Sequence, residues 1–303
     1  MEYVSESSPS KMDDHGRRRF LSTLAMGALA MLSPPGRARE ALPSIRIGFT
    51  PAFVHDQHAL LADWRRYMEK RLGLKVEIVQ RDSYRETMDL LRLKQMDFAW
   101  VCDYPYLHLK DLVRLMAVPL YKGQPLYRSY IIVPASNGNG GAKVGGLKDL
   151  KGGVFAYADP LSNTGYLYPR FAIHKMGEDP KTFFRKTFFT WSHKKVVEAV
   201  ALGLVQGGAV DSYIWETLDR ISPELTHKTR IVQKSPEYGF PPFVAHRDIN
   251  PELFGRVQHF LLTMHQDAEG AALLKRINLD AFSKGDPHLY DGVAEMMRAF
   301  GEH

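Results

Sequence analysis

Apolar and polar positions follow two alternating periods in the first half of the chain, one typical of strands and one typical of helices. Continuous apolar runs such as Phe98–Val101 predict strands that are covered on both faces. Apolar residues four positions apart, as at Leu60, Trp64 and Met68, predict helices. The expected elements are, in chain order, strand Ile45–Phe49, a helix from Leu60 to Gly73, strand Leu74–Val79, helix Tyr84–Lys94 and strand Phe98–Val101. This order predicts a doubly wound α/β sheet.

The same order of strands and helices returns in the second half, after a crossing at Tyr127–Val133. The expected elements there are strand Val154–Ala158, helix Tyr166–Lys175, strand Phe188–Trp191, helix Lys194–Leu204 and strand Gly208–Ser212. Ser235–Phe243 has the composition of a return crossing, and helices Pro251–His265 and Gly292–Ala299 close the chain. We therefore expect two doubly wound α/β lobes joined by two crossings, lobe 1 from residues 39–128 plus 240–303 and lobe 2 from residues 129–239. Two such lobes enclose a cleft that can close on a ligand.

Residues 1–38 have the composition of an export signal. Arg17 and Arg18 stand just ahead of Phe20, as in twin-arginine signals, and the apolar run Phe20–Leu32 is too short to span a membrane. Small residues then favour cleavage after Ala38. We expect a protein that is exported folded and released as a periplasmic monomer; an uncleaved interfacial anchor is the alternative.

Composition narrows the choice of partner. The formal net charge is +6, but the Lys and Arg residues are scattered and have no aromatic residues interleaved with them, so we expect no nucleic-acid partner. A positive charge suits an anionic ligand. The single cysteine, Cys102, excludes an internal disulfide bond.

Residues 159–169 carry the most informative chemical pattern in the chain. A predicted strand ends there, and a turn of Ser162, Asn163, Thr164 and Gly165 opens a helix. Backbone N–H groups, the positive end of the helix dipole and side-chain hydroxyl and amide groups then converge on one point. The pattern predicts an anion-binding turn, although an ordinary helix cap has a similar composition.

Several sequence blocks together resemble the phosphate/phosphite/phosphonate periplasmic binding proteins, a branch of the type II solute-binding fold. These blocks are Ile47–Pro51, Trp64–Gly73, Leu147–Gly152, Asp159–Gly165, Trp191–His193 and Gly208–Ser212. The resemblance implies ligand binding without catalysis, no cofactor, and a membrane partner that recognises the closed form. No nucleophile elbow or orienting third group is present in the sequence, so the residues themselves also give no reason to expect an enzyme.

The resemblance also implies which residues contact the ligand. By position they are Phe53, Tyr106, Ser162, Asn163, Thr164, Gly165, His193 and Asp211. Tyr213 is expected to contact the ligand as well. Binders of aminoalkylphosphonates carry an acidic residue at its place, so the resemblance argues against an aminoalkyl ligand. The Asp211 carboxylate would repel a fully ionised phosphate but would tolerate a protonated or neutral ligand.

Cys102 departs from the family, which usually has a small Gly-Pro turn after the third strand. The end of that strand faces the cleft. The expected helix there, with Asp103 as its N-cap, would favour the Cys102 thiolate. A lone cysteine at this point resembles the arsenite-sensing branch of the family, whose members hold trivalent arsenic and report to a membrane histidine kinase. A soft thiolate suits arsenic, whereas a buried structural cysteine is the alternative interpretation.

Two functional hypotheses follow. The leading one is an extracytoplasmic protein that binds a small oxyanion-type ligand, with arsenite held by Cys102 as the candidate, and signals closure to a histidine kinase. The alternative is the substrate-binding component of an ABC permease for phosphate, phosphite or phosphonate.

Overall fold

The computed structural model describes residues 43–50, 58–135 and 144–302. Arg17 and Arg18, with the rest of the expected export signal, lie outside the described residues, as does Phe53. Within the described ranges no helix has the length and apolar character needed to cross a membrane.

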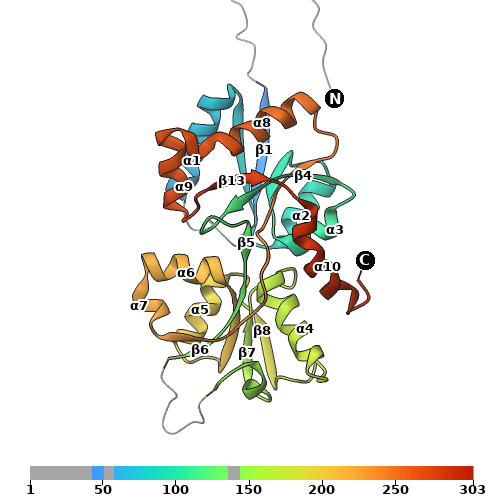
Figure 1. The fold of residues 1–303 in the computed structure, drawn as a ribbon, viewed down its shortest axis with the longest axis vertical. Helices are drawn as coiled ribbons and strands as arrows, with labels where there is room; N and C mark the ends of the chain where they lie inside the picture. The colour runs from blue at the N-terminus through green and yellow to red at the C-terminus, as the bar shows by residue number, and fades with distance from the viewer. Residues whose placement is uncertain (1–42, 51–57, 136–143, 303) are drawn as a thin grey trace, which may run out of the picture. The chain divides into compact units, whose positions relative to one another are not determined.

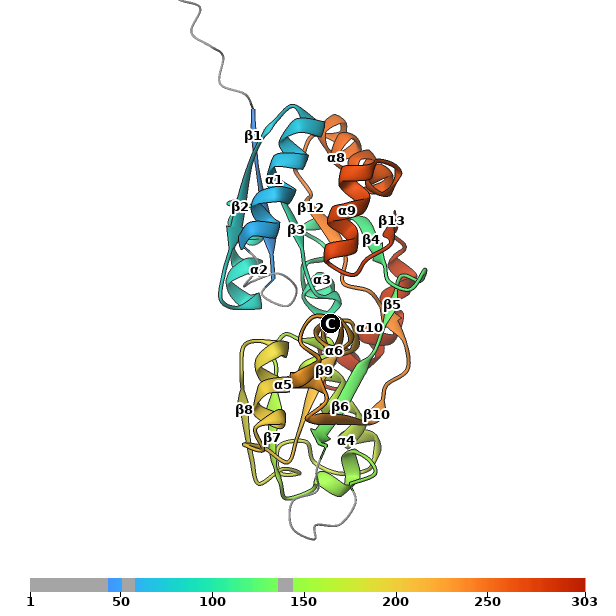
Figure 2. The same ribbon diagram turned by 90° about the vertical axis from the view of Figure 1, so that its left-hand side faces the viewer.

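Lobe 1 is built on a six-stranded sheet with the order β13-β4-β12-β3-β1-β2 (Figure 1 and Figure 2). The strands are β1 (Ser44–Phe49), β2 (Lys75–Gln80), β3 (Phe98–Trp100), β4 (Val113–Leu120), β12 (Phe243–His246) and β13 (Ala281–Lys284). The helices are α1 (His58–Leu72), α2 (Tyr84–Arg92), α3 (Asp103–Leu109), α8 (Pro251–Thr263), η3 (Met264–Gln266) and α9 (Ala268–Arg276). β1 is parallel to β2 and β3, whereas β12 and β13 are antiparallel to β4. The carboxyl ends of β1 and β3 therefore meet at one edge, and α3 begins directly after β3 at that edge.

An aromatic cluster fills the core of lobe 1. Phe49, Trp64, Trp100 and Phe243 are at most 2% exposed, and neighbouring ring centroids in the cluster lie 5.7–6.4 Å apart. Large aromatic side chains that pack at such distances contribute strongly to stability. The strand end that carries Cys102 is thereby fixed on a rigid base.

Lobe 2 is built on a five-stranded sheet with the order β10-β6-β9-β7-β8. Its strands are β6 (Ser129–Pro134), β7 (Val154–Tyr157), β8 (Lys186–Phe189), β9 (Gly207–Asp211) and β10 (Thr229–Lys234). Its helical segments are η1 (Leu147–Leu150), η2 (Asn163–Leu167), α4 (Tyr168–Lys175), α5 (His193–Ala201), α6 (Ser212–Ile221) and α7 (Pro223–Thr226). β7, β8 and β9 are parallel, so η2, α5 and α6 all begin at the same edge of this sheet.

Two short strands join the lobes. β5 (Leu126–Tyr127) pairs antiparallel with β11 (Tyr238–Gly239), so the outgoing and returning chains run side by side between the lobes, as Figure 1 shows for β5. Paired crossings of this kind form the hinge about which two lobes can rotate.

The C-terminal segment contacts both lobes. It contains η4 (Pro287–Tyr290) and α10 (Asp291–Arg298). Beyond α10, the Arg170 guanidinium of α4 lies 4.2 Å above the centre of the Phe300 ring, and the Tyr104 hydroxyl of α3 donates to the Glu302 carboxylate. These contacts link α4 of lobe 2 to α3 of lobe 1.

The predicted α/β class with two sheets and two crossings agrees with the structure, although most element boundaries differ by one to three residues. The helix expected over Tyr166–Lys175 begins earlier, at Asn163, because η2 precedes α4. The strand expected over Phe188–Trp191 ends at Phe189. Trp191 lies instead in a turn, with a φ of 60°.

Candidate functional site

The turn after β7 is a wide helical turn that begins at Ser162. Ser162 is the N-cap residue of η2, and its Oγ accepts a hydrogen bond from the Gly165 N–H at 3.0 Å. The Leu167 N–H donates to the Ser162 carbonyl at 3.0 Å, five residues back, which makes η2 a π-type turn. Such turns are rare in proteins overall, and those that occur are often found at functional sites.

Glycine is required at position 165. A Cβ atom there would lie 2.5 Å from the Ala158 Cβ and 3.0 Å from both the His193 Cε1 and the Ser162 Oγ. Folded cores are packed too tightly to absorb such contacts without a shift of the backbone. Gly165 therefore lets η2 pack directly against the end of β7 and against the His193 ring.

His193 is held in one tautomer. It is the first residue of α5 and is buried. The Asp211 N–H donates to its Nδ1 at 3.1 Å, so the neutral ring carries its proton on Nε2. Nε2 lies 3.3 Å from the Ser162 Oγ and donates to it. Burial lowers the pKa of His193 to about 3, which keeps the ring neutral at physiological pH.

The turn before α5 is strained. Trp191 has a left-handed φ, which is unusual for a bulky residue, and its N–H donates to the Ala158 carbonyl at 2.7 Å. Backbone strain of this kind is concentrated at functional sites. His193 follows Trp191 by two positions and begins α5.

The η2 turn presents polar groups that lack internal partners. The Ser162 Oγ accepts from the Gly165 N–H and from His193 Nε2, which uses both of its lone pairs and leaves its proton to donate elsewhere. Thr164 Oγ1 and Asn163 Oδ1 are buried and have no hydrogen-bond partner within the described part of the chain. Buried polar atoms in folded proteins are nearly always paired, so these two atoms mark the turn as a binding surface.

Lobe 1 faces this turn with three buried side chains, those of Cys102, Asp103 and Tyr127. The Asn163 amide donates to Asp103 Oδ2 at 2.7 Å, directly between the lobes. The Cys102 thiol donates to Asp103 Oδ1 at 3.0 Å. The Tyr127 hydroxyl lies 3.8 Å from Cys102 Sγ and 3.4 Å from Asn163 Nδ2. The lobes are therefore closed on each other at this point.

We define the interlobe site as Cys102, Asp103, Tyr127, Ser162, Asn163, Thr164, His193 and Asp211. All eight side chains are buried, and the set contains acidic and neutral groups but no lysine or arginine. An anionic ligand would be held here by hydrogen-bond donors rather than by an opposite charge.

Two predictions about the start of α3 are wrong. Cys102 rather than Asp103 is the N-cap residue, and Asp103 is the first helical residue, whose Oδ1 accepts from the Tyr104 N–H at 2.9 Å. The thiolate expected at a helix N-terminus is also disfavoured, because burial and the neighbouring Asp103 carboxylate raise the pKa of Cys102 well above its ordinary value. Cys102 is a protonated thiol that donates to Asp103.

Asp211 caps α6 from the end of β9. Its Oδ1 accepts from the Tyr213 N–H at 2.8 Å and from the Ile214 N–H at 3.3 Å. Burial raises the pKa of Asp211 to about 8 despite these two donors, and it raises that of Asp103 to about 6. A protonated Asp211 carries no charge and does not repel an anion. The repulsion between Asp211 and an ionised phosphate that the sequence suggested is therefore absent.

These shifts predict a pH-dependent stability. Native Asp211 holds a proton that the unfolded chain has already released, so its stabilising contribution is present at low pH and is lost as pH rises toward 8. Above about pH 7 His193 is mainly neutral in both states and Asp103 is mainly ionised in both, so neither offsets much of this loss. From pH 7 to 8 the free energy of unfolding should therefore fall by about 1 kcal/mol through Asp211. Urea unfolding at both pH values should show this loss in the wild type and a smaller loss in Asp211→Asn; equal losses would contradict it.

The remaining predicted residues lie around the interlobe site. The Tyr106 N–H donates to the Cys102 carbonyl at 3.0 Å, and its ring lies 4.9 Å from that of Tyr290. The Tyr213 hydroxyl donates to the Ile277 carbonyl and so links the two lobes. Phe53 lies outside the described residues.

Asp103, Tyr127 and Asp159 were not expected to bind across the cleft. Asp159 fixes its own turn by accepting from the Leu161 N–H at 2.7 Å. It also accepts from the Tyr84 N–H of lobe 1 at 3.3 Å. The only sequence signal for these roles is that Asp103 and Asp159 each directly follow a strand end that faces the cleft.

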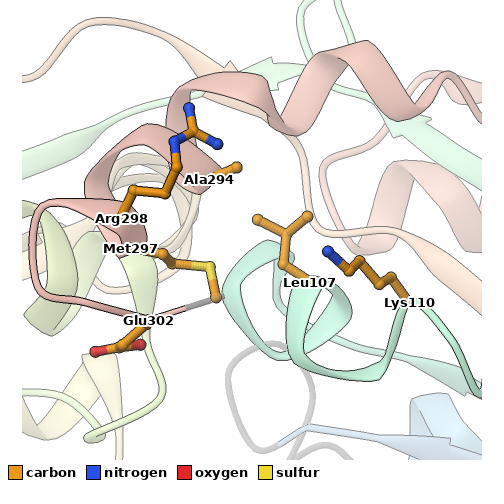
Figure 3. A pocket seen from close by; sticks show the side chains of 6 residues that line it. All are labelled: Leu107, Lys110, Ala294, Met297, Arg298 and Glu302. Atoms are coloured by element: carbon orange, nitrogen blue, oxygen red, sulfur yellow. The ribbon is translucent and has the colours of Figure 1, made fainter.

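Two cavities lie away from the interlobe site. One of about 160 Å³ lies between α3 and α10 and is lined by Leu107, Lys110, Ala294, Met297, Arg298 and Glu302 (Figure 3). Another, of about 420 Å³, lies between α6 and α9. Among the described residues, no group of three or more His, Cys, Asp and Glu side chains is arranged to hold a metal ion.

Comparison with known proteins identifies the family. The sequence model of the family described as "ABC transporter, phosphonate, periplasmic substrate-binding protein" matches residues 47–290. The chain belongs to this family. The phosphonates-binding periplasmic protein of Escherichia coli (strain K12) is 23% identical over 272 residues, which cover 86% of this chain and 78% of the relative.

Solved structures share the fold. A binding protein component of an ABC phosphonate transporter from Pseudomonas aeruginosa has a TM-score of 0.77 at 22% identity, over 84% of this chain and 85% of that one. A protein from Prochlorococcus marinus, solved in complex with methylphosphonate, has a TM-score of 0.76 at 20% identity, over 86% of this chain and 99% of that one. The predicted type II periplasmic binding fold is confirmed.

The protein is therefore a periplasmic substrate-binding protein of the phosphonate/phosphate ABC transporter type, and it is not an enzyme. Members of this family are binding components of ABC transporters. These findings favour the transporter hypothesis over the arsenite-sensor hypothesis, which was the leading one from sequence.

Proposed function

We propose that this protein captures a small tetrahedral oxyanion, a phosphonate, phosphite or phosphate, at the interlobe site and delivers it to an ABC permease. The observation that carries the proposal is the η2 turn, where three consecutive residues offer unsatisfied polar groups. The Ser162 hydroxyl has a proton free to donate, and Asn163 Oδ1 and Thr164 Oγ1 are buried without partners. A ligand oxygen bound there accepts from the hydroxyl groups and benefits from the positive end of the helix dipole.

Closure follows from the position of the same groups. The ligand binds the η2 turn of lobe 2 and meets Asp103 and Tyr127 of lobe 1, so its differential affinity for the closed form stabilises that form. A ligand reaches the site only if the hydrogen bond between Asp103 and Asn163 opens, since both residues are fully buried. The permease then distinguishes the loaded protein by the relative position of its lobes.

The experiment is a calorimetric titration of residues 39–303 with methylphosphonate, phosphite, phosphate and sulfate, for the wild type, His193→Asn and His193→Gln. At least one phosphorus oxyanion should bind the wild type. Asn at 193 keeps an acceptor for the Asp211 N–H but loses the donor to Ser162, so affinity should fall about tenfold or more. Gln keeps a donor near Ser162 and should lose less. Absence of binding to every phosphorus oxyanion would refute the proposal, and equal affinity in all three proteins would place the ligand elsewhere.

Arsenite remains a second candidate ligand, with a histidine kinase as the matching partner. The favouring observation is the buried Cys102 thiol in a site whose residues are acidic or neutral, which suits an uncharged arsenous acid. A kinase gene next to this gene would support the sensor, and permease and ATPase genes would support the transporter.

We assign export to the twin-arginine route on the basis of Arg17 and Arg18. Replacement of both by lysine should keep the precursor in the cytoplasm, and processed protein in the periplasm would contradict this assignment.

A further inference from the structure

We infer that Asp103 makes the interlobe site selective for ligands that carry a hydroxyl group, so that a hydrogen phosphonate binds and a sulfonate of the same shape and charge is rejected. This inference rests on the proposed function and names the residue that sets its ligand class.

The first step concerns the hydrogen bonds that Asp103 would lose when a ligand binds. Its carboxylate is fully buried and accepts from the Tyr104 N–H, the Cys102 thiol and the Asn163 amide. The Asn163 amide is the donor that comes from the opposite lobe, so a ligand that enters between the lobes separates this pair. When a buried carboxylate oxygen loses its hydrogen-bond donor, the complex is strongly destabilised unless the ligand supplies a new donor.

The second step concerns Asn163. Its Nδ2 faces Asp103, and its Oδ1 is buried without a partner, so this end of the site offers acceptors on both sides of the ligand position. The assignment of Nδ2 to the Asp103 side follows from hydrogen bonding, because an ionised carboxylate can only accept. A ligand placed here satisfies both residues only if it has a hydrogen to donate.

The third step concerns the ligand. The monoanion of a phosphonate has one P–O–H group and two oxygens that accept, whereas a sulfonate has three accepting oxygens and no hydrogen. Ser162 and Thr164 can donate to the oxygens of either ligand and do not distinguish them. The Asp103 end of the site distinguishes the two ligands, because a sulfonate oxygen there would face a carboxylate oxygen with no proton between them. No lysine or arginine belongs to the interlobe site to offset that repulsion.

The test compares methylphosphonate with methylsulfonate by calorimetric titration at pH 7, where Asp103, with a pKa of about 6, is mainly ionised and the phosphonate is still largely the monoanion. Wild-type protein should bind methylsulfonate at least about a hundredfold more weakly, because a site built to accept from a hydroxyl rejects analogues that lack it. Asp103→Asn keeps the shape of the side chain and can donate to a sulfonate oxygen, so the ratio of the two affinities should fall about tenfold or more. Asp89→Asn is the matched control. Asp89 lies on α2 of the same lobe, half exposed and paired with Arg92 at 2.8 Å, and its replacement should leave the ratio unchanged.

The outcomes separate the two claims. If wild-type protein binds both ligands with similar affinity, the selectivity inference is wrong and the proposed function stands. If the wild type selects methylphosphonate and Asp103→Asn keeps the same ratio, Asp103 is not the selective residue and the inference is again wrong. If neither ligand binds and phosphite and phosphate also fail, the proposed function is wrong and the inference fails with it. Should Asp103→Asn unfold, as judged by its melting curve, Asp103→Ser is measured in its place and the wild-type ratio remains decisive.

Discussion

Replacement of Gly165 by alanine is expected to abolish ligand binding. The new Cβ would lie 2.5 Å from the Ala158 Cβ, and neither that atom nor the backbone of η2 can move away cheaply in a packed core. The turn must shift, and the shift carries the Ser162 hydroxyl away from His193. Two or more hydrogen bonds to the ligand are then lost at about 1–3 kcal/mol each, so affinity for methylphosphonate should fall about a hundredfold or more. Overpacking should also lower the free energy of unfolding by about 1–3 kcal/mol.

Gly255→Ala is the matched control. Gly255 lies within α8, and a Cβ there would meet no heavy atom within 4 Å. Alanine in a helix interior is favoured over glycine by up to about 1 kcal/mol, so this variant should bind as the wild type does and unfold at slightly higher urea. Calorimetric titration and urea unfolding of both variants decide the matter. Unchanged affinity in Gly165→Ala would show that the η2 turn does not hold the ligand.

The η2 turn could be predicted from sequence because its determinants are local. A strand, a Ser/Asn/Thr/Gly turn and a helix follow one another within residues 154–175, and the Ser162 cap and the requirement for Gly165 both arise inside that stretch. His193 and Asp211 were assigned by family resemblance. The structure adds the physical link between them, since the Asp211 N–H fixes the tautomer of the His193 ring.

The lobe 1 side of the site could not be predicted, because it depends on how the two lobes meet. Asp103 and Asn163 are 60 residues apart, and no periodicity or spacing indicates that their side chains form a hydrogen bond. The ionisation of Cys102 was misjudged for the same reason. A helix N-terminus is visible in sequence and favours a thiolate, whereas the burial that opposes it results from tertiary packing.

Some elements of the fold also escaped prediction for non-local reasons. β4 and β13 pair antiparallel with each other at the edge of the first sheet, although more than 150 residues separate them. β10 likewise pairs with β6 across about 100 residues. Strands of this kind are stabilised by pairing with distant neighbours, which the local pattern of apolar residues does not indicate.

Substitution of Cys102 by serine is expected to separate the two ligand classes. Arsenous acid would bind by exchange, in which a sulfur–arsenic bond forms, an arsenic–oxygen bond breaks, and the thiol proton leaves with the hydroxide as water, with no change of oxidation state. Serine keeps the size and a donor to Asp103 but cannot form that bond. If arsenite is a ligand, Cys102→Ser should lose nearly all response to arsenite and keep its fold, whereas affinity for methylphosphonate should change by less than about tenfold, because the serine hydroxyl still satisfies Asp103.

Titrations of both proteins with arsenite and with methylphosphonate, followed by tryptophan fluorescence, measure these responses. Arsenite binding that persists in Cys102→Ser would exclude the thiol as the arsenic ligand. If neither protein binds arsenite and both bind methylphosphonate alike, the sensor hypothesis is wrong and Cys102 is a buried structural residue that donates to Asp103. The role of Asp103 in ligand selection would then be decided by the comparison of methylphosphonate with methylsulfonate. The raised pKa of Cys102 is consistent with donation to Asp103, since a protonated thiol is a hydrogen-bond donor and a thiolate is not.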